Sequence, residues 1–350
     1  MLKHFWGSLL FTAICLAIGG WYGWSISGTL EGTLSILWIC AVLAVLEVSL
    51  SFDNAAVNAS VLKDMTPVWQ QRFLTWGIAI AVFGMRIVFP LVIVMVAASL
   101  GPVDAIRLAL NEPGEYQRIV SDAHIGLMGF GGAFLGMVGL KFFFDPDKQL
   151  NWIHAIERPV ARVANIEAIA IGVVLIGVWA TSTMLAPDDA LTFITAAIGG
   201  LLTYLAVEIV NHMLEPPTPS SGDVAKAGFG AFLYLEVLDA SFSFDGVIGA
   251  FALTNNLIII AIGLGIGAMF VRSMTIFLVR KGTMSEYRYL EHGAFYAILA
   301  LAVIMFVNTF YHIPEVITGL IGAVLIGLAF WWSVRANRAE AAIRPGEASA

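Results

Sequence analysis

Residues 47–54 read EVSLSFDN and residues 236–245 read EVLDASFSFD, so a short acidic motif occurs once in each half of the chain. Both copies lie inside long apolar stretches. A charged side chain at the centre of a bilayer costs about 3 kcal/mol or more, so acids in such stretches usually face a protein interior or an aqueous cavity. The two copies therefore predict the position of the functional site.

The composition around the motifs is that of a membrane protein. Hydrophobic residues make up 59% of the 350 residues and charged residues only 12%, which favours a chain that lies in a bilayer. We expect an all-α, polytopic membrane protein with a single membrane domain over residues 1–350. The net charge of −7 argues against nucleic acid as a partner. Two cysteines without a CxxC pattern predict neither a disulfide framework nor a zinc site.

Apolar runs long enough to cross a bilayer predict about ten transmembrane helices. Their approximate ranges are 7–25, 34–62, 74–99, 124–144, 168–186, 191–210, 227–253, 257–279, 292–310 and 315–333. We interpret the first run as a helix, because Gly19 to Trp24 offers no small-residue cleavage site for a signal peptidase. The polar connections 100–123 and 145–167 are expected at the membrane interface, and residues 334–350 as a cytoplasmic tail.

The charges of the loops predict the orientation of these helices. With ten helices, only Arg107 and Arg118 lie on one side of the membrane. The basic residues on the other side are Lys3, Lys63, Arg72, Lys141, Lys148, Arg158, Arg162, Lys226, Arg280, Lys281, Arg288, Arg335, Arg338 and Arg344. Basic loop residues concentrate in the cytoplasm, so we expect both termini there.

The order of motifs indicates an internal repeat, with one copy over about 1–186 and the other over about 191–333. Each acidic helix is followed by an apolar run in which a glycine precedes an arginine by nine positions, namely Gly77 and Arg86, then Gly263 and Arg272. The acidic helices are the second and the seventh of ten, so the two repeats would have opposite topology. Inverted repeats of this kind are typical of secondary transporters, whose sites lie near the bilayer midplane.

Helical geometry indicates how the acids meet. Glu47, Ser51, Asn54 and Asn58 share one face of a helix, whereas Ser49 and Asp53 share another. All the carboxylates can converge only if the helices are bent or unwound near 51–54 and near 243–246. Broken helices whose freed carbonyl groups coordinate cations are a known feature of transporters.

The balance of charge within the apolar segments favours a bound cation. Five acids, Glu47, Asp53, Glu236, Asp239 and Asp245, face two arginines, which leaves about three uncompensated negative charges that hydrocarbon would not tolerate. A divalent ion, protons, or both are expected to compensate them. The motifs contain oxygen ligands and neither cysteine nor histidine, so manganese, magnesium or calcium is favoured over zinc and copper. We expect no organic cofactor.

The two motifs resemble the signature helices of the TerC family of integral membrane proteins, and Lys141 to Asp145 is similar to its longer bacterial branch. The resemblance covers about 34–310. Residue by residue, it implies a metal site at Glu47, Asp53, Asn54, Glu236, Asp239 and Asp245. Ser49, Ser51, Ser241, Ser243, Arg86 and Arg272 would support this site. The chain departs from the family at Gly246, where TerC proteins commonly carry serine.

The resemblance implies a function as well as a site. TerC proteins belong to a superfamily that includes lysine exporters, and they are linked to manganese efflux and tellurite resistance. We therefore expect a multi-pass protein of the bacterial inner membrane that exports a divalent cation, manganese above all, in exchange for protons. Its expected partners are the bilayer, the metal ion and protons, and the sequence leaves the oligomeric state open.

Each assignment has a simpler alternative. The acids could be structural groups that form ion pairs with Arg86 and Arg272, and the arginines could reach toward an interface. The four serines could donate hydrogen bonds to carbonyl groups of their own helix. The stretch around Trp152 and Glu157 is better interpreted as an amphipathic interfacial helix than as a reactive site.

Other classes of function fit less well. The chain has no zincin motif, no Gly-x-Ser-x-Gly elbow and no Walker loop, so we expect no enzyme activity. An intramembrane aspartyl protease would carry Gly-x-Gly-Asp around one aspartate, but Asp53 and Asp245 follow Ser-Phe. A membrane scaffold or metal-delivery factor with a role in tellurite resistance is the main alternative to a transporter.

Overall fold

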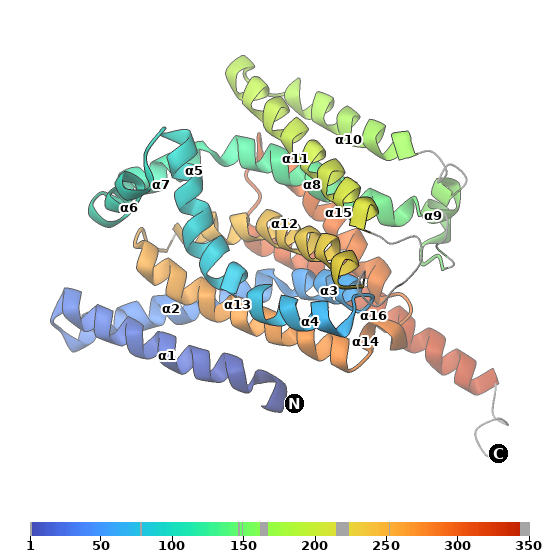
Figure 1. Cartoon of the computed structure of the whole chain (residues 1–350), viewed down its shortest axis with the longest axis horizontal. Helices are drawn as coiled ribbons and strands as arrows, with labels where there is room; N and C mark the ends of the chain where they lie inside the picture. Colours follow the sequence, from blue (N-terminus) through green and yellow to red (C-terminus); the bar gives the residue numbers. More distant parts are fainter. Residues whose placement is uncertain are drawn as a thin grey trace.

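The computed structural model describes residues 2–77, 79–145, 148, 150–161, 167–214, 224–251 and 253–343, and all regular structure in these ranges is helical (Figure 1). The helices of the first half are α1 (Leu2–Ser27), α2 (Leu30–Leu50), α3 (Phe52–Leu62), α4 (Pro67–Arg72), η1 (Phe73–Gly77), η2 (Ile80–Val88), α5 (Phe89–Ala97), α6 (Pro102–Asn111), α7 (Pro113–Asp122) and α8 (His124–Phe143). Those that follow are α9 (His154–Ala161), α10 (Glu167–Ser182), α11 (Pro187–Leu214), α12 (Val224–Phe251), α13 (Leu257–Arg280), α14 (Thr283–Glu286), α15 (Leu290–Asn308) and α16 (Glu315–Ile343).

The described residues contain eight helices that are long and apolar enough to cross a membrane. The expectation of a polytopic, all-α membrane protein is therefore confirmed. All ten predicted segments are largely helical, but α10 has only 16 residues, and α12, which carries the second acidic motif, is not among the eight.

The surface and the interior differ as expected for a protein surrounded by lipid. Large apolar side chains on the outer helices are exposed, such as Trp21 of α1 at 73% and Trp179 of α10 at 68%. The interior is formed by α8, α13 and α15, whose inward faces are almost fully buried. Figure 1 shows α3, α12 and α13 near the middle of the molecule, and these helices position the site.

Polar and glycine residues define where several of these helices begin. The Thr29 hydroxyl accepts a hydrogen bond from the Gly32 amide at the start of α2, and the Asn256 side chain accepts two at the start of α13. Such caps satisfy amide groups that have no partner within the helix. Gly28, which precedes the α2 cap, has a positive φ of 59°, a conformation that glycine adopts without strain.

The predicted break in the first acidic helix is confirmed. Helix α2 ends at Leu50 and α3 begins at Phe52, and Ser51 between them has φ −102° and ψ 19°. This backbone conformation lies outside the helical region and interrupts the regular helix at Ser51. Asp53 is therefore in the first turn of a new helix rather than in the middle of a long one.

The predicted break in the second acidic helix is wrong. Helix α12 runs without interruption from Val224 to Phe251, through residues 243–246. The physical reason is that Glu236, Asp239 and Ser243 already share one helical face at spacings of three, four and seven. No bend is needed for Asp239 and Ser243 to line the same cavity.

The predicted interfacial stretch forms α9, and a buried carboxylate holds the preceding loop against α15. Glu157 is 1% exposed and accepts hydrogen bonds from Lys148 Nζ (2.6 Å), the Ile153 amide (3.0 Å) and the Tyr296 hydroxyl (3.1 Å). Burial opposes ionisation, but the bonds from Lys148 and Ile153 hold the pKa of Glu157 below its ordinary value. This segment is thus fixed by chemistry that its amphipathic pattern did not reveal.

Glycines on α8 permit its close approach to α11, and one of them provides a test of the fold. A Cβ atom added at Gly129 would lie 2.7 Å from the backbone oxygen of Phe193, so Gly129→Ala should force the helices apart and lower the melting temperature in detergent. Gly172→Ala is the control, since nothing lies within 4 Å of its added Cβ, and a small gain from helix propensity is expected there. Equal melting temperatures for both variants would contradict this packing.

Candidate functional site

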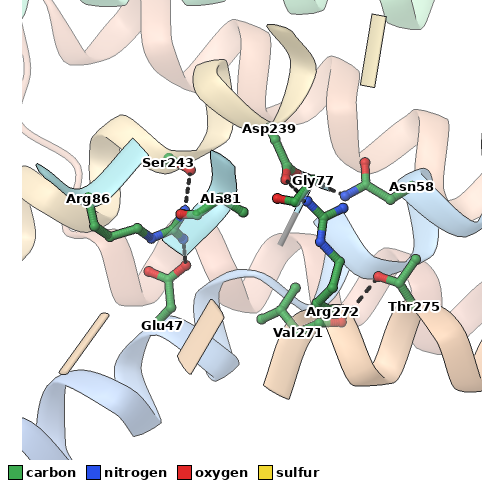
Figure 2. A network of polar contacts seen from close by, with 10 residues as sticks. All are labelled: Glu47, Asn58, Gly77, Ala81, Arg86, Asp239, Ser243, Val271, Arg272 and Thr275. Carbon is green, nitrogen blue, oxygen red and sulfur yellow. Dashed lines mark hydrogen bonds and ion pairs between the residues drawn. The ribbon is translucent and has the colours of Figure 1, made fainter. Parts of the chain in front are cut away.

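Two buried arginines form the centre of the polar interior. Arg86 of η2 and Arg272 of α13 are 4% and 3% exposed. Arg86 forms an ion pair with Glu47, and Arg272 Nη2 lies 3.3 Å from Asp239 Oδ2 (Figure 2). Each arginine therefore compensates one acid of the predicted motifs, and the alternative interpretation of the acids as paired groups is confirmed for Glu47 and Asp239.

The Arg86 network joins the two halves of the sequence. Arg86 Nη1 donates to the Ser243 hydroxyl at 3.0 Å and to the Ala81 carbonyl at 2.8 Å. The Ser51 hydroxyl donates to Glu47 Oε1 at 3.1 Å. Arg86 lies in a π-helical segment, a feature that is rare and frequent at functional sites. A serine from the second motif therefore contacts the arginine that neutralises the first motif.

The Arg272 network joins the halves in the reciprocal way. Asn58 Nδ2 of α3 donates to Asp239 Oδ1 at 2.8 Å, and Arg272 Nη2 donates to the Gly77 carbonyl at 2.7 Å. The guanidinium group also lies 3.8 Å from the centre of the Phe73 ring, in cation–π contact. A Cβ atom added at Gly77 would lie 2.8 Å from Glu236 Oε1 and 3.0 Å from Arg272 Nη2, so a side chain at this position would displace these charged groups.

A small cavity, here called the arginine cavity, lies between these networks and has a volume of about 20 Å³. Its polar lining residues are Glu47, Ser51, Asn54, Asn58, Arg86, Asp239, Ser243, Arg272 and Thr275. The predicted stripe of Glu47, Ser51, Asn54 and Asn58 is therefore confirmed, because all four residues line this cavity. Asn58 Oδ1, Arg86 Nε and Arg272 Nη1 are buried, and no described residue forms a hydrogen bond with them. The cavity is large enough for one water molecule.

A second small cavity, here called the Asp53 cavity, has a volume of about 30 Å³. Its oxygen-bearing side chains are Glu47, Ser51, Asp53, Asn54 and Thr318, and the other lining residues are Leu50, Phe242, Gly246, Leu301 and Gly319. Glu47 borders both cavities. Its Oε1 atom pairs with Arg86. Its Oε2 atom lies beside Gly246, where an added Cβ atom would be only 2.8 Å away.

Asp53 differs from Glu47 and Asp239 because no described cationic side chain pairs with it. It is 8% exposed, and the Asn54 amide donates to its Oδ1 at 3.0 Å. A buried carboxylate needs a compensating charge or a proton, because burial of an uncompensated ion costs several kcal/mol or more. The Asp53 cavity is thus the part of the polar interior that is lined by oxygen atoms able to accept hydrogen bonds, but by no described lysine or arginine side chain.

Glu236 occupies a different environment from the one predicted. It is 7% exposed, both of its carboxyl oxygens lack a partner among the described residues, and it borders an apolar cavity of about 390 Å³ with Met85, Phe89 and Leu233. It lines neither the arginine cavity nor the Asp53 cavity.

The predicted ligands therefore do not form one cluster in this conformation. The described residues contain no group of three or more His, Cys, Asp or Glu side chains placed to bind a metal ion. Glu47 and Asp239 pair with different arginines. Glu236 borders the apolar cavity, and its Oε1 would lie 2.8 Å from a Cβ atom added at Gly77. The side chain of Asp245 lies outside the described part of the structure.

The four predicted supporting serines divide into two classes. Ser49 donates to the Val45 carbonyl at 2.7 Å and Ser241 to the Val237 carbonyl at 3.0 Å, which confirms the simpler interpretation for both. Ser51 and Ser243 instead bond to Glu47 and Arg86.

Sequence reasoning missed Thr318, which lines the Asp53 cavity from α16. A single threonine in an apolar run carries no signal of its own, so only the approach of α16 to the helix break identifies it.

Comparison with known proteins places the chain in a family. A family model with the description "Protein of unknown function (DUF475)" matches residues 52–340, which include Asp53, both arginines, the second acidic motif and Thr318. No curated protein and no solved structure matches the chain. Because the family model covers well over half of the sequence, the chain belongs to the DUF475 family.

Proposed function

We propose that the protein is a membrane transporter that exports a hard divalent cation, with the Asp53 cavity as its binding site. The observation that carries the proposal is the position of Asp53, a buried acid without a cationic partner in an oxygen-lined cavity beside a helix break. Broken helices near acidic residues are the sites at which many secondary transporters bind their ions.

The chemistry of the lining supports a hard cation. The cavity offers carboxylate, amide and hydroxyl oxygens from Glu47, Asp53, Asn54, Ser51 and Thr318, and none of the described lining residues carries a sulfur or imidazole group. Oxygen ligands suit manganese, magnesium and calcium. The volume of about 30 Å³ exceeds the roughly 10–15 Å³ that one water molecule requires, so a single dehydrated ion is the appropriate occupant. Manganese is favoured by the resemblance to TerC proteins, as is the export direction.

The two arginines supply counter-charges when no ion is bound. A cation that approaches Glu47 from the Asp53 cavity would compete with Arg86 for the same carboxylate. Arg86 also bonds to Ser243 of α12, so a change at Glu47 would alter contacts between the two halves of the chain. An ion that binds one conformation more tightly than the other shifts the population toward the conformation that it prefers. Alternating access requires such a shift. Exchange against protons would restore the balance of charge in the return step.

The proposed transporter has ten membrane-spanning helices arranged as two inverted repeats, with both termini in the cytoplasm. The two acid–arginine pairs support the repeat, because Glu47 with Arg86 and Asp239 with Arg272 follow the same order along the chain. Figure 1 shows α6 and α7 at one end of the molecule and α9 and α14 at the other, which agrees with connections on opposite sides of a bilayer.

The first test removes the uncompensated charge. Asp53→Asn should abolish manganese efflux from metal-loaded cells while the amount of protein in the membrane stays normal, because the amide cannot replace the charge that attracts the ion. We expect the same result for Asp245→Asn. Ser49→Ala is the matched control, since the Ser49 hydroxyl bonds only to its own helix, and its efflux should equal that of the wild type.

Unchanged efflux in both aspartate variants would overturn the assignment of the site. If the purified protein in proteoliposomes moves no metal under any gradient, the transport proposal itself fails. A TerC-like scaffold or metal-delivery role would then be the better interpretation.

The second test concerns the arginine that neutralises Glu47. Arg86→Gln leaves a buried carboxylate without its counter-charge, and removal of one partner of a buried ion pair typically costs about 3–5 kcal/mol. We expect a clearly lower melting temperature for this variant, measured by thermal unfolding in detergent. Glu47→Gln combined with Arg86→Gln should recover most of the loss but should not transport.

The control for this experiment is Arg107→Gln, which changes an arginine whose side chain is 71% exposed in a pair with Asp104 at 3.8 Å. Exposed pairs contribute little to stability, so its melting temperature should match the wild type. A double variant that melts as low as Arg86→Gln alone would show that the two side chains do not compensate each other.

A further inference from the structure

The last long helix, α16, belongs to neither acidic motif, yet it closes the Asp53 cavity. One face of α16 is exposed, with Val316, Leu320 and Val324 each more than half accessible. Thr318 and Gly319 line the Asp53 cavity. The helix therefore separates the candidate cation site from the surroundings of the protein.

Two glycines allow α16 to contact both sides of the helix break. An added Cβ at Gly319 would lie 2.7 Å from Leu50 Cδ2 and 3.2 Å from Leu50 Cα, at the end of α2. An added Cβ at Gly322 would lie 2.9 Å from Asp53 Oδ2 and 3.3 Å from Asp53 Cγ, at the start of α3. A side chain at position 322 would thus compete for space with the carboxylate itself. Gly327 on the same helix has nothing within 4 Å of its added Cβ.

The hydroxyl group of Thr318 is available to a ligand. Other threonines in these helices donate to the carbonyl four residues earlier, as Thr203 does to Gly199 (2.8 Å) and Thr275 to Val271 (3.1 Å). Among the described residues Thr318 Oγ1 makes no such bond, and the Pro314 carbonyl accepts only backbone amides. A half-buried hydroxyl that borders a cavity with a free carboxylate has the chemistry of a neutral oxygen ligand.

We infer that α16 completes the cation site, with Thr318 as a neutral ligand and Gly322 as the residue that determines which size of ion is accepted. The inference rests on the proposed binding of a cation in the Asp53 cavity. Calcium takes more ligands at 2.3–2.6 Å, whereas magnesium demands about 2.0–2.1 Å. A methyl group at position 322 would push the Asp53 carboxylate into the cavity of about 30 Å³, and the larger ion would lose more affinity.

The test of Thr318 is calorimetric titration of the purified full-length protein with manganese, magnesium and calcium. Thr318→Val removes the oxygen at nearly constant shape and should weaken binding by about tenfold, the lower end of the effect expected when support of a metal site is lost. Thr318→Ser keeps the hydroxyl and should bind as the wild type does. Equal affinities for the valine and serine variants would overturn the role of Thr318.

The test of Gly322 compares ions rather than absolute affinities. Gly322→Ala should lower the affinity for calcium several-fold more than the affinity for magnesium, whereas Gly327→Ala should leave the ratio unchanged. Because the ratio is measured on one protein sample, a general loss of stability would not imitate the effect. An unchanged ratio in Gly322→Ala would overturn the role of Gly322.

The same titrations separate failure of this inference from failure of the proposed function. A wild-type protein that binds none of the three ions would overturn the proposed function, and this inference with it. A wild-type protein that binds, together with α16 variants that bind identically, would overturn this inference alone.

Discussion

The structure depends on one constraint, which is that a carboxylate buried among apolar helices must meet a compensating charge. Glu47 meets Arg86 and Asp239 meets Arg272. Buried ion pairs add little net stability, but the loss of one partner is costly, so these pairs fix which helices must be neighbours. Helices α2, η2, α12 and α13 are brought together to satisfy them.

The same constraint explains why Asp53 stands out. The arginines reach Glu47 and Asp239, whereas the break at Ser51 places Asp53 on a new helix that faces Gly322 of α16. Among the described residues Asp53 and Glu236 are thereby left without an ion pair, and Asp53 borders the oxygen-lined cavity in which we propose that a cation binds. Arg86 neutralises Glu47, one of the two carboxylates that line the Asp53 cavity. The hydrogen bond from Arg86 to Ser243 connects this cavity to the other half of the chain.

Much of the site could be predicted from spacing alone. Glu47, Ser51, Asn54 and Asn58 were placed on one face by helical periodicity, and they line one cavity. The break near Ser51 followed from the need of the acids to converge. The same reasoning failed for α12, because it assumed that every acid must reach a single point. Glu236 does not reach it and borders apolar side chains instead, a separation that depends on which neighbours pack against each face.

The sequence by itself determined the membrane class, the helical segments and the residues that carry charge into the apolar interior, because hydropathy and helical period are local properties of the chain. Only the tertiary structure decided which acid pairs with which arginine, which acids remain without an ion pair and which distant helix closes the cavity. Thr318 and Gly322 acquire their importance from contacts with residues more than 260 positions away. Such contacts arise from packing in three dimensions, and no local pattern in an apolar helix records them.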